Sequence, residues 1–507
     1  MSVMVDQHRK ADARGWAALG ALMFPVLLVS VNNTALSFAL PAISAGLRPT
    51  AAQLLWIVDI YPLVLAALLI PVGSLGDRIG RRKMLIIGSS GFGLVSLGAA
   101  FAPSAEWLLA ARVGIAVFGS MLLPTTLSLL RTVFQDDRQR SLAIAIWTAG
   151  FSAGAALGPI AGGFLLNHFW WGSVFLLAVP VLIAFLIAAP LLLPESRDPH
   201  PGPVDPASIV LAILTMAPIV YGIKTMATGG SALHGVLFIA VGALSGLLFA
   251  RRQVVKDYPM LDLRFFRSPR FSGGLSVNVV SNVAMFGFLF FLTQHLQLVS
   301  GMDPMTSGLL MVPGLLLAIV AGLTAAKLAY TIGLRNAVVL GLLLVALGFL
   351  LVFFTDQQAS ALPVLGGFTV MSAGVGIATT LSTDLVVSSV PERKAGAASA
   401  VSETGYEVGA VLGTAVLGGV TTAFYQAHLD LPAALDPASA QAAHETLGGA
   451  LDVAAQSPLQ ASIVDAATAA FSSGMQWSSL VGGLMVLVVA MVLVRVLRAD
   501  RRMPRTH

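Results

Sequence analysis

The chain has 507 residues, of which 57% are hydrophobic and 10% are charged, whereas an ordinary soluble domain is about 25% charged. This composition excludes a water-soluble fold and predicts a polytopic membrane protein. Continuous apolar runs such as Leu63 to Ile70 favour helices, because the strands of a membrane barrel alternate apolar and polar residues. The lack of cysteine excludes disulfides, cysteine-ligated zinc sites and thiol chemistry.

The first fifteen residues are polar, and an apolar run follows from Trp16 to Leu40 without a small-residue cleavage site. We therefore expect a retained signal anchor. Further apolar segments are long enough to cross about 30 Å of hydrocarbon. The predicted spans are 16–40, 54–75, 84–103, 107–130, 141–166, 171–193, 206–226, 234–250, 271–296, 306–328, 336–354, 362–387, 395–424 and 471–494. The sequence thus predicts an all-α protein with fourteen membrane-spanning helices.

The lysine and arginine residues support this count through the positive-inside rule. With both termini in the cytoplasm, the basic residues of the loops and tails fall on the inner side, and only Arg48 and Lys224 fall outside. An error of one helix would put half of the loops on the wrong side. The net charge of +5 therefore indicates topology and not a surface for nucleic acid. Lys224, at an outer helix end, is expected to snorkel to the interface.

An internal repeat relates the two halves of the chain. Residues 150–158 are GFSAGAALG and residues 405–413 are GYEVGAVLG, an offset of 255 residues. Both copies run in the same direction, which fits two bundles related by an axis along the membrane normal; chance similarity between glycine-rich helices is the alternative. Glycines at every fourth residue of each copy predict a stripe for close helix contact.

The predicted organisation has two bundles, an insertion between them and one long outer loop. The parts are a cytoplasmic N-terminus at 1–15, an N-terminal six-helix bundle at 16–193, two inserted helices at 194–252, a cytoplasmic linker at 253–270, a C-terminal six-helix bundle at 271–497 and a cytoplasmic tail at 498–507. The outer loop at 425–470 has acidic residues and no Lys or Arg. It is predicted to be either a simple solvated loop or a small amphipathic hairpin that attracts substrate or caps the outer face.

A tight turn with a carboxylate and a basic cluster joins the second and third spans. It runs from Gly73 through Asp77 and Arg81 to Lys83. No strand precedes it, which excludes a phosphate-binding loop. Asp77 is predicted to pair with a basic residue or a helix N-terminus in one conformational state and to release it in the other. The alternative is that the basic residues only anchor the topology.

This turn resembles the loop signature of the major facilitator superfamily. Arg112 in the fourth span is similar to the buried arginine of that family, and the stretch with Gly154, Gly158 and Pro159 resembles the helix-five motif that marks its antiporters. Gly73, Asp77, Arg81, Gly154, Gly158, Pro159 and Asp384 are the predicted gating residues.

Two further segments, Trp56–Tyr61 and Ser402–Glu407, are similar to the fourteen-helix drug:proton antiporter branch, and most of all to exporters of quaternary ammonium compounds and cationic dyes. The resemblance implies the major facilitator fold, with two six-helix bundles plus two additional transmembrane helices. It also implies a multi-pass protein of the bacterial inner membrane that is a monomer and not an enzyme. Its partners would be lipophilic cations, protons and membrane lipids, and its energy source the proton gradient, with no cofactor and no metal.

Four carboxylates in the spans need an explanation, because a charge at membrane depth is costly unless it is paired, protonated or wet. They are Asp59, Asp384, Glu403 and Glu407. Glu403 and Glu407 lie on one helical face, roughly 12 and 18 Å from the inner end of their span. Burial disfavours the charged form and two charges repel, so at least one of the pair is expected to hold a proton until a lipophilic cation arrives. Asp59 is expected either to meet cation or proton near the exit or to be a solvated residue at the interface, and Asp384 either gates or is simply solvated.

Arg112 is the lone cation deep in the first bundle and a candidate partner in a proton relay. The family resemblance implies an aspartate in the first span, where this chain has Asn32, followed by Asn33 and Thr34. Asparagine has the shape of a protonated carboxyl group but cannot titrate. Either proton coupling has moved to other residues, or Asn32 is an engineered imitation of the protonated state, which is the hypothesis that we favour.

Aromatic and methionine side chains are predicted to line a cavity for flat cations, about half of them in contact with substrate, through cation–π attraction of about 0.5–2 kcal/mol each. They are Trp56, Tyr61, Trp147, Phe151, Met285, Phe286, Phe290 and Tyr406. His295 ends a span beside Gln294 and Gln297, where an interfacial role is favoured over a proton-carrying one.

The sequence thus predicts a transporter that exports lipophilic cations in exchange for protons by alternating access. One alternative keeps the fold and changes the cargo to an endogenous antibiotic or a lipid-like metabolite. Another is a membrane enzyme or sensor, which is disfavoured because the chain has neither a nucleotide-binding loop nor a His-carboxylate spacing for metal.

Overall fold

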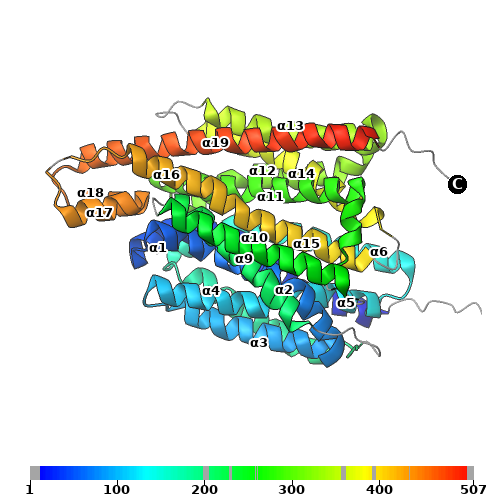
Figure 1. Cartoon of the computed structure of the whole chain (residues 1–507). Coiled ribbons are helices and arrows are strands. Elements are labelled where there is room, and N and C mark those ends of the chain that lie inside the picture. Colours follow the sequence, from blue (N-terminus) through cyan, green and yellow to red (C-terminus); the bar gives the residue numbers. More distant parts are fainter. Residues whose placement is uncertain are drawn as a thin grey trace, which may run out of the picture.

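A computed structural model of the chain describes residues 12–197, 205–227, 231–256, 259, 261–354, 361–390, 395–432 and 434–499. Every regular element in these ranges is helical (Figure 1). Fourteen helices within them are long and apolar enough to cross a membrane, so the predicted fold class and span count are confirmed. The expected N-terminal segment up to residue 11 and the end of the tail from residue 500 lie outside the described residues.

The N-terminal half forms a bundle of six spans. The first three are α1 (Ala13–Leu47), α2 (Ala51–Ile79) and α3 (Arg81–Ala100). A turn at residues 120–122 divides the fourth into α4 (Ala105–Gly119) and α5 (Leu123–Val133), the fifth is α6 (Asp137–His168), and α7 (Ser173–Leu176) with α8 (Ala178–Leu192) forms the sixth. Side-chain caps explain several of the starting points. For example, Thr50 and Gln53 form a reciprocal capping box at the start of α2.

The C-terminal half follows the same plan after the short helix η1 (Leu263–Arg267). Its spans are α11 (Pro269–Gln294) continued by the π-helix η2 (His295–Val299), then α12 (Pro304–Ile332), α13 (Leu334–Phe353), α14 (Ala361–Ser388), α15 (Ala395–Leu412) continued by the π-helix η4 (Gly413–Gly418) and by α16 (Gly419–His428), and finally α19 (Gln460–Ala499). The inserted pair, α9 (Pro206–Ala227) and α10 (Ala232–Val255), lies between the halves in sequence.

Two glycines show the repeat in backbone geometry. Gly80 joins α2 to α3 with φ of +118°, and Gly333 joins α12 to α13 with φ of +86°. Both values lie in a region that side chains with a Cβ rarely occupy. Each glycine makes the tight turn between the second and third spans of its own bundle, so the halves share this turn as well as the glycine-rich fifth span.

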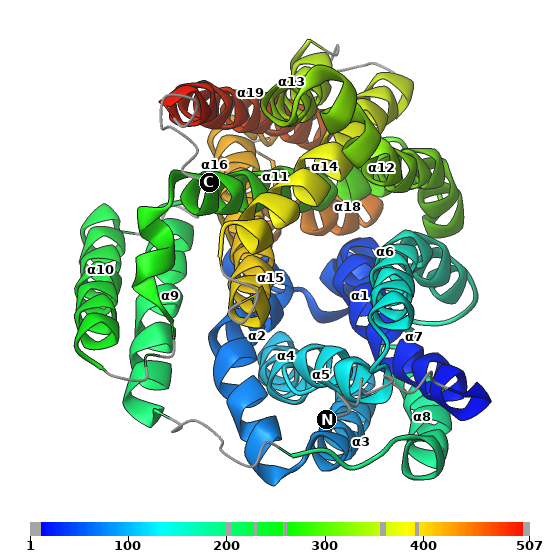
Figure 2. The same ribbon diagram turned by 90° about the vertical axis from the view of Figure 1, so that its right-hand side faces the viewer.

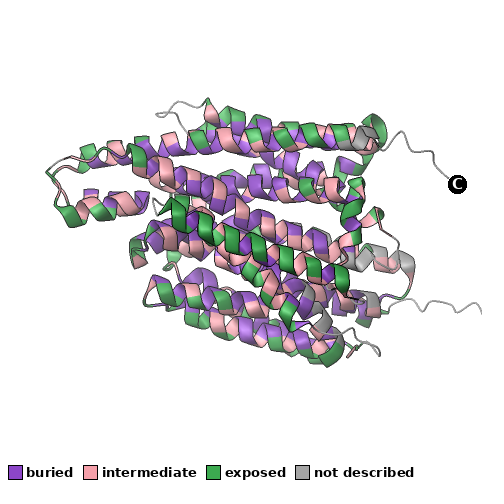
Figure 3. Cartoon of the chain, in the orientation of Figure 1, coloured by how far each residue is buried: buried purple, intermediate pink, exposed green. Residues whose placement is uncertain are grey.

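The two bundles meet along a seam, and the inserted pair lies to one side of them next to α2 and α15 (Figure 2). Across the seam α2 packs against α15, α6 against α12 and α1 against α11. Buried residues concentrate within the bundles, while exposed residues follow the outer faces of α9 and α10 (Figure 3). The exposed residues of α10 include Leu233, Leu244 and Leu247, which suits a helix surrounded by lipid.

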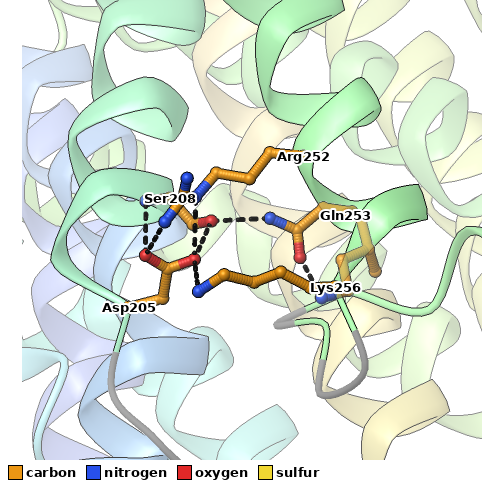
Figure 4. A network of polar contacts seen from close by, with 6 residues as sticks. Asp205, Ser208, Arg252, Gln253 and Lys256 are labelled. Atoms are coloured by element: carbon orange, nitrogen blue, oxygen red, sulfur yellow. Dashed lines mark hydrogen bonds and ion pairs between the residues drawn. The ribbon is translucent and has the colours of Figure 1, made fainter.

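A polar network fixes the inserted pair at the end nearest the linker (Figure 4). The Arg252 guanidinium donates two hydrogen bonds to the Asp205 carboxylate at 3.0 and 3.1 Å, and Lys256 Nζ lies 2.6 Å from Asp205 Oδ2. Gln253 Nε2 donates to Ser208 Oγ at 2.7 Å. The hydrogen bonds from Arg252, followed by those from Lys256 and Ser208, hold the pKa of Asp205 far below its usual range. The network therefore joins the start of α9 to the end of α10.

The long loop after α16 contains a helical hairpin of α17 (Pro437–Glu445) and α18 (Leu447–Ala455). This hairpin marks the end of the molecule opposite the start of α1 (Figure 1). The topology predicted from the sequence puts this end on the outer side, and it is hereafter called the outer end. Tyr425 Oη donates to the carbonyl oxygen of Ala443 at 2.7 Å, within the C-terminal half. The hairpin also reaches the other bundle, since Ser44 Oγ and Thr446 Oγ1 are 3.1 Å apart and Glu445 Oε2 accepts from the backbone N of Ala51 at 2.8 Å. The hairpin is thus a cap that joins both bundles and not a simple solvated loop.

Candidate functional site

A narrow cavity lies on the seam between the bundles, with room for about one water molecule. Both bundles contribute to its wall, which is polar on both sides. It is lined by Asn33 and Leu36 of α1, Val58, Asp59 and Pro62 of α2, Arg112 of α4, Phe286 of α11, Glu407 and Ala410 of α15, and Thr414 of η4. The cavity is too small for a drug-sized ligand, for which pockets of about 300 Å³ or more are typical, so this conformation is closed around its polar residues.

Glu407 is the acidic group that the C-terminal bundle gives to this cavity. Its side chain is 2% exposed, and its Oε2 atom is buried without a hydrogen-bond partner in the described part of the chain. Glu403, one turn earlier on α15, is half-buried and does not line the cavity. The two predicted carboxylates therefore differ in setting: one faces the seam cavity and the other lies beside it.

Asp59 forms an ion pair that corrects one prediction. Lys224 Nζ of α9 lies 2.9 Å from Asp59 Oδ2, and the two side chains are 1% and 0% exposed. Lys224 was expected to snorkel to the interface because it lies near a helix end, but α9 packs against α2 and turns this side chain inward. Its ammonium also lies 4.2 Å from the centre of the Trp56 ring, within the range of cation–π attraction.

Arg112 finds its partners in the backbone of α2. Its Nε donates to the carbonyl oxygen of Ile57 at 3.0 Å and its Nη2 to that of Val58 at 3.4 Å. In a regular helix the carbonyl of Val58 would accept from residue 62, but Pro62 has no N–H to donate. The guanidinium therefore satisfies an acceptor that the proline leaves open, and it lies 4.7 Å from the centre of the Tyr61 ring.

Four of the predicted aromatic residues form a row across the seam. The ring centres of Trp147 and Phe151 in α6 are 6.3 Å apart. Tyr406 of α15 contacts Phe151 at 5.9 Å and Phe286 of α11 at 5.6 Å, both edge to face. This aromatic row, formed by Trp147, Phe151, Tyr406 and Phe286, joins the two bundles and reaches the cavity at Phe286.

Two of the other predicted cavity residues lie elsewhere. Phe290 is buried against Leu40, Leu54 and Leu55 and lines a second small cavity below the hairpin. Met285 packs against the core of the C-terminal bundle.

The asparagines of α1 are divided between the cavity and its surroundings. Asn33 lines the cavity and Asn32 does not. The Nδ2 atoms of both are buried without a hydrogen-bond partner among the described residues. His295, expected at the interface, is instead 3% exposed and belongs to the buried start of η2.

The predicted gating residues occupy three places. Gly154 and Gly158 of α6 pack against α1, where Ser30 Oγ donates to the carbonyl of Phe151 at 2.5 Å and Thr34 Oγ1 to that of Ala155 at 3.1 Å. The carbonyl of Pro159 lies against Gly308 of α12. These contacts make α6 a close partner of both bundles.

Arg81 of the basic turn holds the N-terminal bundle together. Its Nη1 donates to Thr132 Oγ1 at 3.2 Å and to Ser196 Oγ at 3.3 Å. Asp384 is exposed near the end of α14. The side chains of Asp77 and Ile70 and the surroundings of Gly73 lie outside the described part of the chain, although their backbones belong to α2.

The sequence carries a signal for the ion pair, though not for which residues form it. Asp59 and Lys224 both lie within predicted spans, and each needs an opposite charge at that depth. Nothing in the sequence said that α9 lies against α2, which is a property of the packing.

Comparisons with known proteins agree with this architecture. A family model described as Major Facilitator Superfamily matches residues 22–414. The multidrug efflux pump LfrA of Mycolicibacterium smegmatis is 50% identical over 95% of this chain and 96% of its own length. The methyl viologen resistance protein SmvA of Salmonella typhimurium is 35% identical over 94% of this chain and 98% of its own.

A solved structure shares the fold at low sequence identity. The bacterial homologue of the human lysosomal transporter Spinster, in an inward-facing and occupied conformation, superposes with a TM-score of 0.68 at 15% identity, over 96% of this chain and 98% of that one. The resemblance first seen in the motifs is confirmed. The chain belongs to the Major Facilitator Superfamily and is a multi-pass transporter of the bacterial inner membrane.

Proposed function

We propose that this transporter is a drug exporter that moves lipophilic cations outward in exchange for protons. The names of the two relatives, a multidrug efflux pump and a methyl viologen resistance protein, support drug export as the class of function. Methyl viologen is a flat organic dication, so a cationic cargo is consistent with the second name. Lipophilic cations also suit a seam that offers carboxylates and aromatic rings together.

The observation that carries the proposal is the Glu407 carboxyl group in the seam cavity. One of its oxygens is buried without a hydrogen-bond partner in the described part of the chain. A charged carboxylate in this position would be costly, whereas a protonated one is not. Glu407 therefore holds a proton in the closed conformation and releases it when a cation takes its place.

Exchange follows from this competition between proton and cation. A cation that enters from the inner side favours the charged form of Glu407, and a proton arriving from the outer side discharges the cation. Glu403, one helical turn away, provides a second carboxyl group on the same helix. Each proton that enters gains about 2.3 kcal/mol per 100 mV of membrane potential, and each positive charge that is exported loses the same amount. The potential therefore drives uphill export when more protons enter than positive charges leave, and the pH difference drives it in either case.

The closed cavity must widen to admit cargo, so the aromatic row opens when the bundles move apart. Phe151 and Tyr406 lie on opposite sides of the seam, at 5.9 Å between ring centres. Their separation exposes ring faces at the point where a flat cation enters. Each such face contributes about 0.5–2 kcal/mol to cation binding.

The test is ethidium efflux in everted membrane vesicles, with and without an imposed proton gradient, for the parent chain and for Glu407→Gln. Glutamine keeps the shape of the protonated acid but cannot release a proton. We expect gradient-dependent efflux to fall by more than about tenfold, which corresponds to a rise of about 1.4 kcal/mol in the activation free energy of the gradient-driven step. Asp430→Asn, at an exposed position of the outer end, is the matched control and should keep full coupling.

An unaffected Glu407→Gln variant, or efflux that does not depend on the gradient, would contradict the proposed exchange. The alternative cargo, an endogenous antibiotic or a lipid-like metabolite, gives a different outcome. In that case the Glu407→Gln variant loses coupling, but the preference for charged over uncharged compounds stays as it was.

A further inference from the structure

Lys224 belongs to the inserted pair, yet its ammonium group lies at the wall of the seam cavity. The helix that carries it lies beside the bundles (Figure 2). Its ammonium is 2.9 Å from a carboxylate oxygen of Asp59 and 4.2 Å from the centre of the Trp56 ring. A carboxylate and an aromatic face are the two groups that bind organic cations in proteins. The side chain of Lys224 thus occupies a cation site that the N-terminal bundle provides.

The helix α9 contacts both bundles and must respond when they move. Val220 packs in one cluster with Leu63 of α2, Val411 of α15 and Ala415 of η4. Tyr221 of α9 adds a ring contact with Trp56 at 6.4 Å. Any change in the angle between α2 and α15 must therefore shift α9 against at least one of them.

Charge counting in the cavity shows what the lysine does. Asp59, Arg112 and Glu407 line the cavity, and Lys224 adds one positive charge through Asp59. With Glu407 charged, these four groups sum to zero. Without Lys224 they would sum to one negative charge, and the attraction for a bound cation would grow in proportion to the charge of that cation.

We propose that Lys224 is a tethered cation that occupies the Asp59–Trp56 site in the closed conformation and competes there with positively charged substrates. This inference rests on the proposed function, because it assigns the charge selectivity of the same site. Lys224 is then a specificity-determining residue: with it in place Asp59 is neutralised, and a second positive charge on the substrate can use Asp59 only by displacing it. The inserted pair thus sets which cations the seam accepts.

The test is equilibrium binding to purified protein in lipid nanodiscs at one fixed pH. The probes are ethidium as a monocation, methyl viologen as a dication and an uncharged aromatic compound of similar size. For Lys224→Met we expect affinity to rise about threefold for the monocation and about tenfold for the dication, because the electrostatic gain doubles with the charge. The affinity of the uncharged probe should not change.

Three variants make the comparison specific. Lys224→Arg keeps the charge and should keep the parent ratio of dication to monocation affinity. The double variant Asp59→Asn with Lys224→Met restores the charge sum and should lose the gain. Lys327→Met removes an equal charge from an exposed position on α12 and should leave all three affinities unchanged.

A second measurement uses the parent chain, in case Lys224→Met does not fold. Acetylation of Lys224 by a small membrane-permeant reagent, followed by mass spectrometry, should increase several-fold when methyl viologen saturates the protein. Unchanged acetylation, or a folded Lys224→Met protein with an unchanged ratio of dication to monocation affinity, would overturn the proposal. Neither measurement uses a proton gradient. If the vesicle assay shows no proton coupling, these two measurements therefore still test the role of Lys224.

Discussion

Arg112 and Pro62 are structurally linked, because the arginine supplies a hydrogen-bond donor that the proline lacks. The proline leaves the carbonyl of Val58 without its helical donor, and the guanidinium supplies one from α4 while also holding Ile57. A buried positive charge is thereby fixed at the cavity wall. Backbone carbonyl groups of α2, and not a carboxylate, therefore hold the positive charge of Arg112 in this wall, where it repels cations.

This pairing predicts a specific coupling between two substitutions. Arg112→Met should lower the thermal unfolding midpoint, because the Val58 carbonyl loses its donor at a cost of about 1–3 kcal/mol. In a Pro62→Ala background an N–H returns at residue 62, so the same change should cost at least about 0.5 kcal/mol less. Thermal unfolding of the four proteins of this cycle in detergent measures the difference.

Pro71 provides the control for this cycle, since it is the other proline inside α2 and does not line the cavity. Pro71→Ala should combine additively with Arg112→Met. Additive behaviour of the Pro62 cycle as well would show that Arg112 does not replace the missing amide.

The residues of the site were predictable from the sequence where they carry a charge within an apolar span. Asp59, Arg112 and Glu407 are charged groups in apolar spans, and the cost of such charges identified them as functional candidates. Their partners were not predictable, because Lys224 reaches Asp59 only through the packing of α9 on α2. Asn33, Pro62 and Thr414 were missed for a different reason: uncharged side chains in a span are not costly enough to stand out. The role of Asn32 stays a prediction.

At the level of helices, apolar length predicted all fourteen spans but not their ends. The helix α1 continues to Leu47, beyond the predicted Leu40, and α19 begins at Gln460, before the predicted residue 471. Hydropathy reports only the part of a helix that lies in hydrocarbon, and these helices extend past it. The π-helices η2 and η4 also escaped prediction, since local packing and not periodicity produces them.

The two turns with positive φ give a matched prediction on the repeat. Gly80→Ala and Gly333→Ala should each cost roughly 1–3 kcal/mol for the backbone conformation. Gly80→Ala should cost more, because a Cβ there would lie 2.6 Å from Glu195 Oε1, whereas nothing lies within 4 Å of one at Gly333. Thermal unfolding midpoints in detergent provide the measurement.

A larger loss for Gly333→Ala would contradict this account of the turns. Gly98→Ala is a suitable control, since Gly98 lies within α3 with ordinary helical geometry and a Cβ there would meet no atom within 4 Å. This substitution should be neutral or slightly stabilising, because alanine favours helices.

At the scale of the whole molecule, the bundles are joined at the outer end. The cap formed by α17 and α18 reaches α1 and α2, Gln297 Nε2 donates to the carbonyl of Phe38 at 3.2 Å, and Asn167 Nδ2 donates to Asp303 Oδ1 at 2.8 Å. An outward-open state must break these contacts, since each crosses the seam. They therefore form the lock of the closed outer end, and its strength sets how often that end opens.

The carboxylate of Asp303 makes this lock sensitive to acid. Hydrogen bonds from Thr306 and Asn167 lower the pKa of Asp303 from 3.8 to about 2. Thr306 lies in the helix that Asp303 caps, so only the bond from Asn167 crosses the seam. The share of the lowering that Asn167 causes means that the charged form stabilises the closed end, fully above pH 4 and less as the pH falls toward 2. The whole shift would raise the ratio of open to closed outer ends by about sevenfold between pH 6 and pH 3, so the share that Asn167 supplies should raise it by less. Because the chain has no cysteine, spin labels at His168→Cys and Leu309→Cys can measure the distance across this end. In an Asn167→Ala background the longer distance should be more populated at pH 6 and should change less with acid, whereas a distribution that is the same at pH 6 and pH 3 in the parent chain would remove Asp303 from the lock.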